Sequence, residues 1–322
     1  MKAGPLLHLL AAGELCSGEM LGQALGISRA AVWKQVQALR QQGWVVETVP
    51  RQGYRLRPAI ELLSVADLQA RLAAAGLRLS VHEETTSTNA DVLQAFAAGQ
   101  GHAQVVLAES QTQGRGRHGR SWYAPYARNF IGSLGWRFEM AAAQLAGLSL
   151  ALGVAVARCL EELQPTLAIG LKWPNDLQIG GRKLGGLLVE LAGDAAGPCE
   201  VVIGLGLNHH LDSKDHAHID QAAIALAACG CEITRQDLAV RLVLALRDAC
   251  KQFAESGFAA FHGDYARYDS LRDRPLQAWR GQERLLGYGR GVDEQGALCI
   301  ESMGQLWRVH SGEVSVREHL AA

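Results

Sequence analysis

Apolar residues recur at helical spacing in three short segments near the start of the chain, and polar residues fill the positions between them. The predicted helices cover 5–12, 17–25 and 28–42. Pro5 suits a first helical turn, Ser17 and Ser28 suit N-caps, and Gly26 suits the left-handed residue that ends a helix. In the third helix the apolar positions share one face, and the polar ones lie elsewhere. The apolar set is Ala31, Val32, Val36 and Leu39.

Two alternating runs, WVVETV and GYRLR, flank the turn at 50–53 and predict a hairpin with a basic tip. Helix, short Leu-Gly-Ile-Ser turn, helix and hairpin together are typical of a winged helix-turn-helix, whose last helix enters the major groove of DNA. A protein-interaction module of the same shape is the alternative. The candidate DNA contacts are Ser28, Arg29, Lys34, Gln35 and Arg51. Their division between bases and phosphates stays open.

The rest of the chain predicts two further units. A short helix at 64–75, capped by Ser64, leads to strand-like runs at 79–84, 104–109, 129–136, 166–172, 184–191 and 199–207, with helices near 87–98, 142–163 and 235–255. Strands that do not alternate regularly with helices favour an α+β fold with a mixed sheet backed by helices. From Arg274 onward, short alternating runs between glycine turns predict a small antiparallel barrel. We expect domains at 1–60, 61–272 and 273–322.

Composition narrows the class of protein. The 322 residues are 48% hydrophobic and 20% charged, which is typical of a globular chain with sizeable cores. We expect no secretion signal and no membrane insertion, because the apolar start is short and lacks a cleavage pattern. Seven cysteines are an odd number without a CxxC pair, so we expect free thiols in a reducing cytoplasm.

Charge is unevenly distributed along the chain. Residues 1–58 hold seven Lys and Arg against three Glu, a balance of +4, and the remainder carries −5. A small basic domain on an acidic body indicates that the N-terminal part contacts a polyanion, although a charge of this size also occurs on ordinary solvated surfaces.

The segment 111–122, QTQGRGRHGRSW, interleaves arginines with glycines and cannot form an apolar face. Glycines let backbone N–H groups approach an anion, and arginine supplies a planar donor fork, so the pattern indicates phosphate or carboxylate binding. A flexible basic loop is the alternative. The glycines also satisfy GxGxxG, but a strand rather than a helix follows, which excludes a dinucleotide-binding turn.

A second segment, KWPND at 172–176, is followed by a Gly-Gly turn and GRKLGGLLVE. Lys172 and Lys183 flank this hairpin, so both can face one pocket. A lysine can neutralise a phosphate, while the Asp176 carboxylate takes a proton or helps to hold a divalent metal. Taken singly, each of these residues is more often an ordinary surface or turn residue.

These motifs, with STN at 87–89 and GLGLN at 204–208, resemble those of biotin protein ligases. The resemblance extends over essentially the whole chain, and the winged helix and trailing barrel are similar to the bacterial bifunctional class, the biotin operon repressors. It implies a class II synthetase-like ligase domain and an SH3-like barrel. It also implies biotin and ATP as substrates, Mg²⁺, a biotin carboxyl carrier protein of acetyl-CoA carboxylase, operator DNA, and a homodimer formed on adenylate binding.

The resemblance assigns roles to individual positions. Catalysis falls to Arg117, Lys183 and Asp176, with Asp176 also on the metal side. Biotin contacts fall on Ser87, Thr88, Asn89, Gln111, Arg115, Gly116, Arg117, Lys183, Gly185, Gly186 and Gly204. Contacts with ATP or the adenylate fall on Arg115, Arg117, Arg120, Trp122, Lys172, Asn175, Lys183 and Asn208.

Some features leave alternatives open. His118 stands where relatives are expected to carry a basic residue, so the charge of the loop should respond to pH. The histidines at 209, 210, 216 and 218 are expected to be surface residues rather than a metal site, because their spacing is irregular. The residues that stack on adenine are not assigned. A lipoate ligase and a biotin sensor without catalysis are the competing hypotheses.

Overall fold

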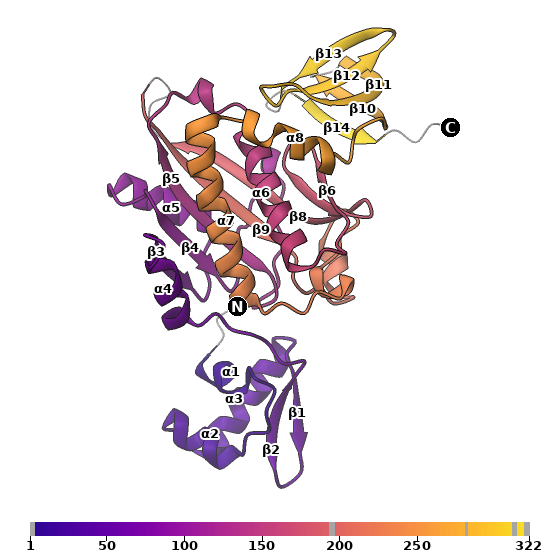
Figure 1. Ribbon diagram of the computed structural model, residues 1–322. Coiled ribbons are helices and arrows are strands. Elements are labelled where there is room, and N and C mark those ends of the chain that lie inside the picture. Colours follow the sequence, from indigo (N-terminus) through magenta and orange to yellow (C-terminus); the bar gives the residue numbers. More distant parts are fainter. Residues whose placement is uncertain (1–3, 193–196, 281–282, 311–313, 319–322) are drawn as a thin grey trace.

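The computed structural model describes residues 4–192, 197–280, 283–310 and 314–318, and Figure 1 shows three units along the chain. The N-terminal unit contains α1 (Pro5–Leu10), α2 (Gly18–Leu25), α3 (Arg29–Gln41) and the antiparallel pair β1 (Val45–Val49) and β2 (Gly53–Arg57). The predicted winged helix-turn-helix is therefore confirmed.

Local capping explains why the helices begin where they do. The Ser17 hydroxyl accepts a hydrogen bond from the Met20 amide at 3.1 Å, and the Ser28 hydroxyl accepts one from the Ala31 amide at 3.2 Å. Gly26 ends α2 with a φ of 65°. Val32, Val36 and Leu39 of α3 are buried against the other helices, so the opposite face of α3 is left to solvent.

The central unit is built on a seven-stranded sheet with the order β3-β4-β5-β9-β8-β7-β6. Only β3 and β4 are parallel to each other; the remaining neighbours pair antiparallel. The strands are β3 (Arg78–His82), β4 (Gln104–Ala108), β5 (Phe130–Phe138), β6 (Ile169–Lys172), β7 (Asp176–Ile179), β8 (Arg182–Ala192) and β9 (Cys199–Leu207).

Helices cover both faces of this sheet. Helices α6 (Leu148–Leu163) and α7 (Arg235–Ser256) pack on one face over the main core, and α8 (Ala259–Tyr268) packs beside α6 (Figure 1). Helix α5 (Thr88–Ala97) covers the other face over a smaller core of Val92, Phe96, Val106 and Val202. Helix α4 (Val65–Ala73) lies beside β3. The predicted mixed sheet backed by helices is confirmed.

One segment, 142–163, has the length and composition of a membrane-spanning helix, but 67% of its 18-residue apolar stretch is buried inside the protein. It consists of a short 3-10 turn, Ala142–Leu145, and then α6, which packs on the sheet beside α7. Its apolar character is therefore that of a core helix.

The C-terminal unit is a small antiparallel sheet with the strand order β13-β12-β11-β10-β14. Its strands are β10 (Pro275–Arg280), β11 (Glu283–Val292), β12 (Leu298–Ser302), β13 (Gln305–Val309) and β14 (Val314–Glu318). A bulge between Gly289 and Val292 bends β11, as is common where small sheets curve. The predicted end of one strand at 311–312 lies outside the described residues.

Three predicted details were wrong. Strand β7 and helix α8 were not expected, because β7 is only four residues long and α8 follows α7 almost without a break. Ser64 makes no capping hydrogen bond through its side chain; its backbone amide instead donates to Gln236 Oε1 at 3.0 Å. Ser64 therefore contacts α7 through its backbone and does not cap α4 through its side chain.

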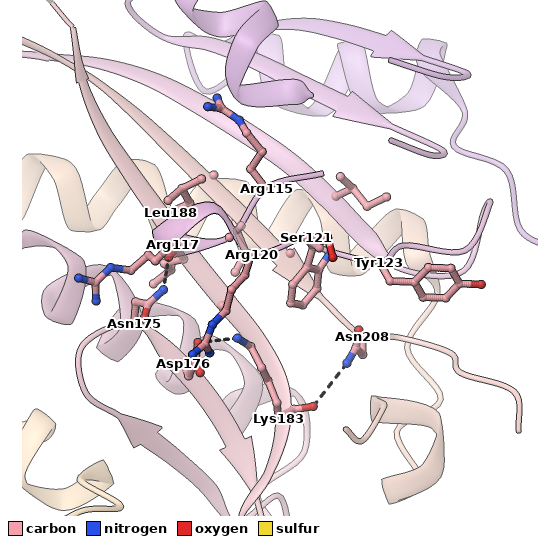
Figure 2. A pocket seen from close by; sticks show the side chains of 18 of the residues that line it. Arg115, Arg117, Arg120, Ser121, Tyr123, Asn175, Asp176, Lys183, Leu188 and Asn208 are labelled. Carbon is pink, nitrogen blue, oxygen red and sulfur yellow. Dashed lines mark hydrogen bonds and ion pairs between the residues drawn. The ribbon is translucent and has the colours of Figure 1, made fainter. Parts of the chain in front are cut away.

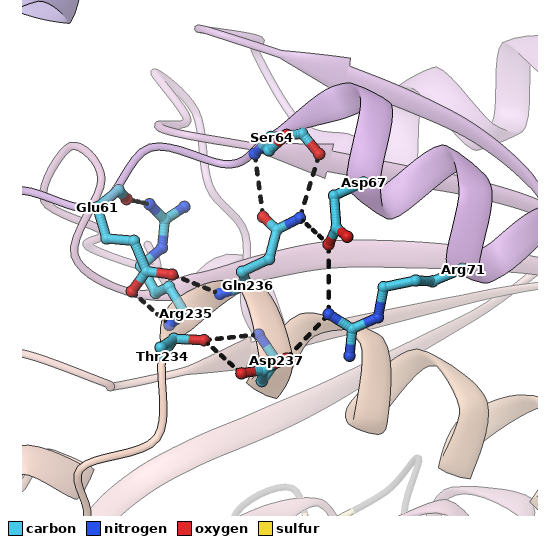
Figure 3. A network of polar contacts seen from close by, with 8 residues as sticks. All are labelled: Glu61, Ser64, Asp67, Arg71, Thr234, Arg235, Gln236 and Asp237. Atoms are coloured by element: carbon cyan, nitrogen blue, oxygen red, sulfur yellow. Dashed lines mark hydrogen bonds and ion pairs between the residues drawn. The ribbon is translucent and has the colours of Figure 1, made fainter.

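A network of polar side chains joins the linker at 61–67 to the start of α7 (Figure 3). Glu61 accepts backbone hydrogen bonds from Arg235 at 2.6 Å and from Gln236 at 2.9 Å. The Arg235 side chain is 2% exposed and forms an ion pair with buried Glu109 at 2.6 Å. Because Glu109 also accepts from the Leu63 amide at 2.7 Å, this network fixes the path of the linker.

Candidate active site

One cavity of about 610 Å³ opens where the ends of β5, β8 and β9 meet the loop at 111–122. It is lined by residues from segments that lie far apart in the sequence, including the STN, Arg-rich, KWPND and GLGLN motifs. A cavity of this size suits a ligand with the dimensions of an activated cofactor. Figure 2 shows Arg117, Arg120, Asp176 and Lys183 around it.

One end of the cavity is a neutral polar cluster. Ser133 donates to Thr88 Oγ1 at 2.7 Å or to Asn89 Oδ1 at 2.6 Å, and Gln111 Oε1 accepts from the Thr88 amide at 2.8 Å. Asn89 Nδ2 donates to Glu190 at 2.6 Å. Since Thr88 and Asn89 are buried, their side chains are held in fixed orientations.

Two glycines of β9 create the space for neighbouring side chains. A Cβ atom on Gly204 would lie 2.2 Å from Asn89 Oδ1, and one on Gly206 would lie 2.4 Å from the Trp122 ring. Trp122 therefore lies flat against the strand, with its indole 5.7 Å from the Lys183 ammonium. Among the described residues, the buried Trp122 Nε1 has no hydrogen-bond partner. A buried donor of this kind is stabilised when a ligand accepts from it.

The Arg-rich segment folds back on itself over the cavity. Gly116 N donates to Arg120 O at 2.7 Å, and Trp122 N donates to Gly114 O at 2.8 Å. Arg115 forms an ion pair with Glu190 at 3.3 Å. Burial lowers the pKa of the Arg117 guanidinium, and the Asp176 carboxylate opposes that shift. The loop thus carries positive charge into a partly desolvated space, where it attracts an anion most strongly.

Lys183 and Asp176 form the ion pair at the centre of the site, with 2.8 Å between Nζ and Oδ1. Lys183 lies on β8 and Asp176 begins the adjacent β7, so the sheet holds both backbones. Both side chains are mostly buried, at 16% and 22% exposed. This pair supplies one cation and one carboxylate within reach of the same ligand atom.

The opposite end is organised by hydrogen bonds of the Asn208 side chain. Its Nδ2 donates to Ile224 O at 3.2 Å, and its Oδ1 accepts from Asn129 Nδ2 at 3.3 Å. Asn175, which lies next to Asp176, donates from Nδ2 to Leu187 O at 2.6 Å. These amides are held by the fold and face the same cavity.

Sixteen of the seventeen predicted ligand residues line this cavity. They are Ser87, Thr88, Asn89, Gln111, Arg115, Gly116, Arg117, Arg120, Trp122, Lys172, Asn175, Asp176, Lys183, Gly186, Gly204 and Asn208. The exception is Gly185, which is buried against β9: a Cβ atom there would lie 2.7 Å from Gly206 O. The structure therefore places Gly185 outside the cavity lining, where a contact with biotin was predicted.

Sequence reasoning missed several residues of the site. Ser133 and Glu190 organise Asn89, and Tyr123 and His218 line the cavity as a stacked pair with ring centroids 4.9 Å apart. Ser133, Tyr123 and His218 lie in a strand or loops whose pattern has no special motif, and Glu190 ends the GRKLGGLLVE segment without an assigned role.

The expectation that all four histidines lie on the surface was wrong for one of them. His209 is 6% exposed, and its Nε2 lies 2.8 Å from Ile233 O. Burial lowers its pKa, so it is held neutral. His210, His216 and His218 are exposed. Within the described ranges, no group of three His, Cys, Asp or Glu side chains is placed to hold a metal.

The predicted DNA-contacting side chains lie together on the N-terminal unit. Arg29, Lys34 and Gln35 are exposed on α3, and Arg51 is exposed at the hairpin turn with a φ of 64°. Ser28 caps α3. The structure adds Trp33, which is 53% exposed beside Arg29 and Lys34 and was not expected. An exposed indole on a basic helix face is unusual for a free surface.

Comparison with known proteins agrees with this architecture. Residues 81–208 match the biotin/lipoate A/B protein ligase family, and residues 6–55 match an HTH domain. The fold resembles the biotin protein ligase from Aquifex aeolicus, solved in complex with biotin and ATP, with a TM-score of 0.64 at 24% identity. That match covers 75% of this chain and 99% of the other. The fold and site thus define a protein ligase joined to a helix-turn-helix.

Similarity over the whole chain identifies the family more closely. The chain is 37% identical over 313 residues to the bifunctional ligase/repressor BirA of Escherichia coli (strain K12), covering 97% of this chain and 96% of that one. It is 36% identical over 269 residues to the biotin–[acetyl-CoA-carboxylase] ligase of Mycobacterium tuberculosis, covering 81% and 97%. The chain belongs to the bifunctional ligase/repressor BirA family.

Proposed function

We propose that the cavity binds biotin and ATP, joins them as biotinyl-adenylate, and passes the biotinyl group to a lysine of a carrier protein. The observation that carries this proposal is the composition of one cavity, which is lined by five Lys and Arg side chains together with a cluster of neutral polar side chains. The cations are Arg115, Arg117, Arg120, Lys172 and Lys183. A neutral head group matches the polar cluster, and a carboxylate and a phosphate match the cations.

The neutral cluster suits the ureido ring of biotin. A ureido group presents one carbonyl acceptor and two N–H donors, and it carries no charge. Thr88 and Gln111 offer hydroxyl and amide groups to it, and Asn89 is oriented by Glu190. Because these partners are held in fixed orientations, a ligand that lacks the ring cannot match their donors and acceptors, which favours biotin over lipoate.

The cationic centre suits adenylation. A biotin carboxylate oxygen attacks the α-phosphorus of ATP, a new O–P bond forms, and pyrophosphate leaves. Lys183 and Arg117 hold the two anions together and stabilise the charge that develops on the α-phosphate oxygens. In the second step the carrier amine attacks the anhydride carbonyl carbon, and AMP leaves with the electron pair. Asp176, beside Lys183, is the carboxylate that accepts the proton.

The donor set fits a magnesium ion bound together with ATP. Mg²⁺ is usually held by one or two carboxylates with substrate phosphates and water, and Asp176 supplies one carboxylate next to the cationic centre. When bound, the ion would neutralise phosphate charge.

Two regions complete the proposal. Asn175, Asn208 and Trp122 lie on the nucleotide side of the cavity.

The N-terminal unit binds operator DNA through α3 and the hairpin, and loading with adenylate favours a homodimer that represses biotin synthesis genes. The acceptor is the biotin carboxyl carrier protein of acetyl-CoA carboxylase. We place the protein in the cytoplasm, where its seven free cysteines stay reduced.

Carrier labelling tests the proposal. Purified protein is incubated with Mg-ATP, an apo biotin carrier domain, and either labelled biotin or labelled lipoate. We expect label from biotin alone, and a loss of labelling in Arg117→Ala. Labelling from lipoate instead would contradict the substrate assignment. Bound adenylate without any transfer would identify a sensor.

A further inference from the structure

The segment at 209–221 closes one side of the cavity, and a buried carboxylate holds it in place. Asp215 begins a short 3-10 turn, Asp215–His218, and is 1% exposed. Its neighbours Lys214 and His216 are both exposed. Burying a carboxylate is costly unless hydrogen bonds and opposite charge compensate for the lost water.

Most of the compensation comes from the strip at 123–128, immediately after the Arg-rich loop. Tyr123 Oη donates to Asp215 Oδ1 at 3.0 Å, and Arg128 lies 3.7 Å from Asp215 Oδ2. Arg128 also pairs with Asp212, and its backbone carbonyl accepts from the His210 amide at 3.0 Å. The Asp212 amide donates to Asp215 at 2.7 Å within the segment itself.

The Tyr123 ring also packs on the segment it holds. It stacks on His218 with the rings inclined by 24°, and both residues line the cavity. Burial, with Asp215 beside it, raises the pKa of Tyr123 to about 12, so the hydroxyl keeps its proton at neutral pH and donates. Figure 2 shows Tyr123 directed away from Arg117 and Lys183, toward the outer side of the pocket.

We propose that the Tyr123–Asp215 hydrogen bond is a latch that retains the acyl-adenylate by holding segment 209–221 against the strip at 123–128. This inference rests on the proposed function. Tyr123 and Asp215 are positioning residues: they keep His218, Ile219 and Gln221 at the cavity wall. Opening the latch exposes the nucleotide end of the cavity and leaves the Lys183–Asp176 pair in place.

The test compares two latch variants with a matched control. Tyr123→Phe keeps the ring that stacks on His218 and removes only the hydroxyl, and Asp215→Asn removes the charge. Tyr268→Phe removes a similar bond, in which Tyr268 Oη donates to Glu161 at 2.6 Å, at a position that does not line the cavity. Full-length protein is loaded with labelled biotin and Mg-ATP without carrier, and release of labelled adenylate is followed after adding unlabelled adenylate.

We expect release to be about tenfold faster in both latch variants, the size of effect of one lost hydrogen bond to a charged group. In Asp215→Asn, whose side chain does not line the cavity, the rate of the first pyrophosphate burst should stay within about twofold of wild type, and Tyr268→Phe should behave as wild type. A merely structural role would change burst and release together. Release within about twofold of wild type in Tyr123→Phe would overturn the latch.

A ligand-free measurement separates the latch from the proposed function. Lys214 is exposed next to Asp215, so trypsin cleavage after it reports on the segment. We expect faster cleavage there in Tyr123→Phe than in Tyr268→Phe, even without biotin or ATP. Equal cleavage would overturn the latch. If wild type retains no adenylate while cleavage still differs, the proposed function fails and the contact between the two segments stands.

Discussion

Replacing Arg235 with alanine should destabilise the joint between the linker and the catalytic unit. The guanidinium forms an ion pair with Glu109 at 2.6 Å, donates to Asn129 O at 3.1 Å, and also contacts the Glu61 carbonyl. Both members of the ion pair are at most 6% exposed. Without Arg235, Glu109 is a buried carboxylate that has lost its cation.

The expected cost follows from that burial. Removing one partner of a buried pair lowers the free energy of unfolding by about 3–5 kcal/mol, whereas an exposed pair contributes roughly 0–1 kcal/mol. For a unit of this size, the loss corresponds to a fall in Tm of roughly 6–20 °C. A double variant, Arg235→Met with Glu109→Leu, should recover much of the stability because no unpaired charge remains.

Urea unfolding and calorimetry would measure both effects. The control is Arg137→Ala, which removes an ion pair of 3.2 Å whose side chains are 49% and 74% exposed. We expect the control to lose no more than about 1 kcal/mol. If Arg235→Ala lost no more than the control, or if the double variant were less stable than the single one, the reasoning about the buried pair would be refuted.

Three further variants test other parts of the account. Gly204→Ala places a methyl group 2.2 Å from Asn89 Oδ1. The Kd of this variant for biotin, measured by calorimetry, should therefore rise about a hundredfold. The control is Gly263→Ala, whose added methyl group meets no neighbouring atom. An unchanged affinity for biotin would argue against placing biotin at the neutral polar cluster. Trp33→Ala should weaken binding to a DNA duplex selected from a random library about tenfold, without changing the slope of log binding constant against log salt concentration. Lys34→Ala should reduce that slope by about 1, because it removes a phosphate contact. A changed slope in Trp33→Ala would contradict a base contact. Burial lowers the pKa of His209, so the unfolded state binds a proton more readily, and stability should fall as pH drops below the ordinary value of 6.5. In His209→Gln, the midpoint of urea unfolding should fall less as the pH drops. His210→Gln, which changes an exposed histidine, is the control. An identical pH dependence in the two variants would refute the role of His209.

The local pattern of the sequence predicts most of the elements because caps and periodicity are local properties. Ser17, Ser28 and Gly26 act as expected at the helix ends. Ser64 makes no capping hydrogen bond, and its contact with Gln236, which is distant in sequence, could not be expected from the local pattern. The domain limits at 60 and 272 stay predictions.

The site was predictable where chemistry is concentrated in a short motif. Arginines between glycines, or two lysines around a hairpin, indicate anion binding without knowledge of the fold. Ser133, Glu190, Tyr123 and Asp215 were missed because each acts through a partner between 44 and 101 residues away. Gly185 was misplaced because a motif does not show which of its glycines is packed against the neighbouring strand, and Gly185 is paired with Leu207 and packed against Gly206 of β9.

The most direct test of the central claim is to identify the molecule that the cavity makes. Wild type and Lys183→Met protein are incubated with biotin and Mg-ATP without carrier, freed of small molecules, and analysed by mass spectrometry of the extracted ligand. The account predicts biotinyl-AMP on the wild type and a large loss of it from the variant. Biotin and ATP bound side by side without the joined product, or equal product in both proteins, would contradict it.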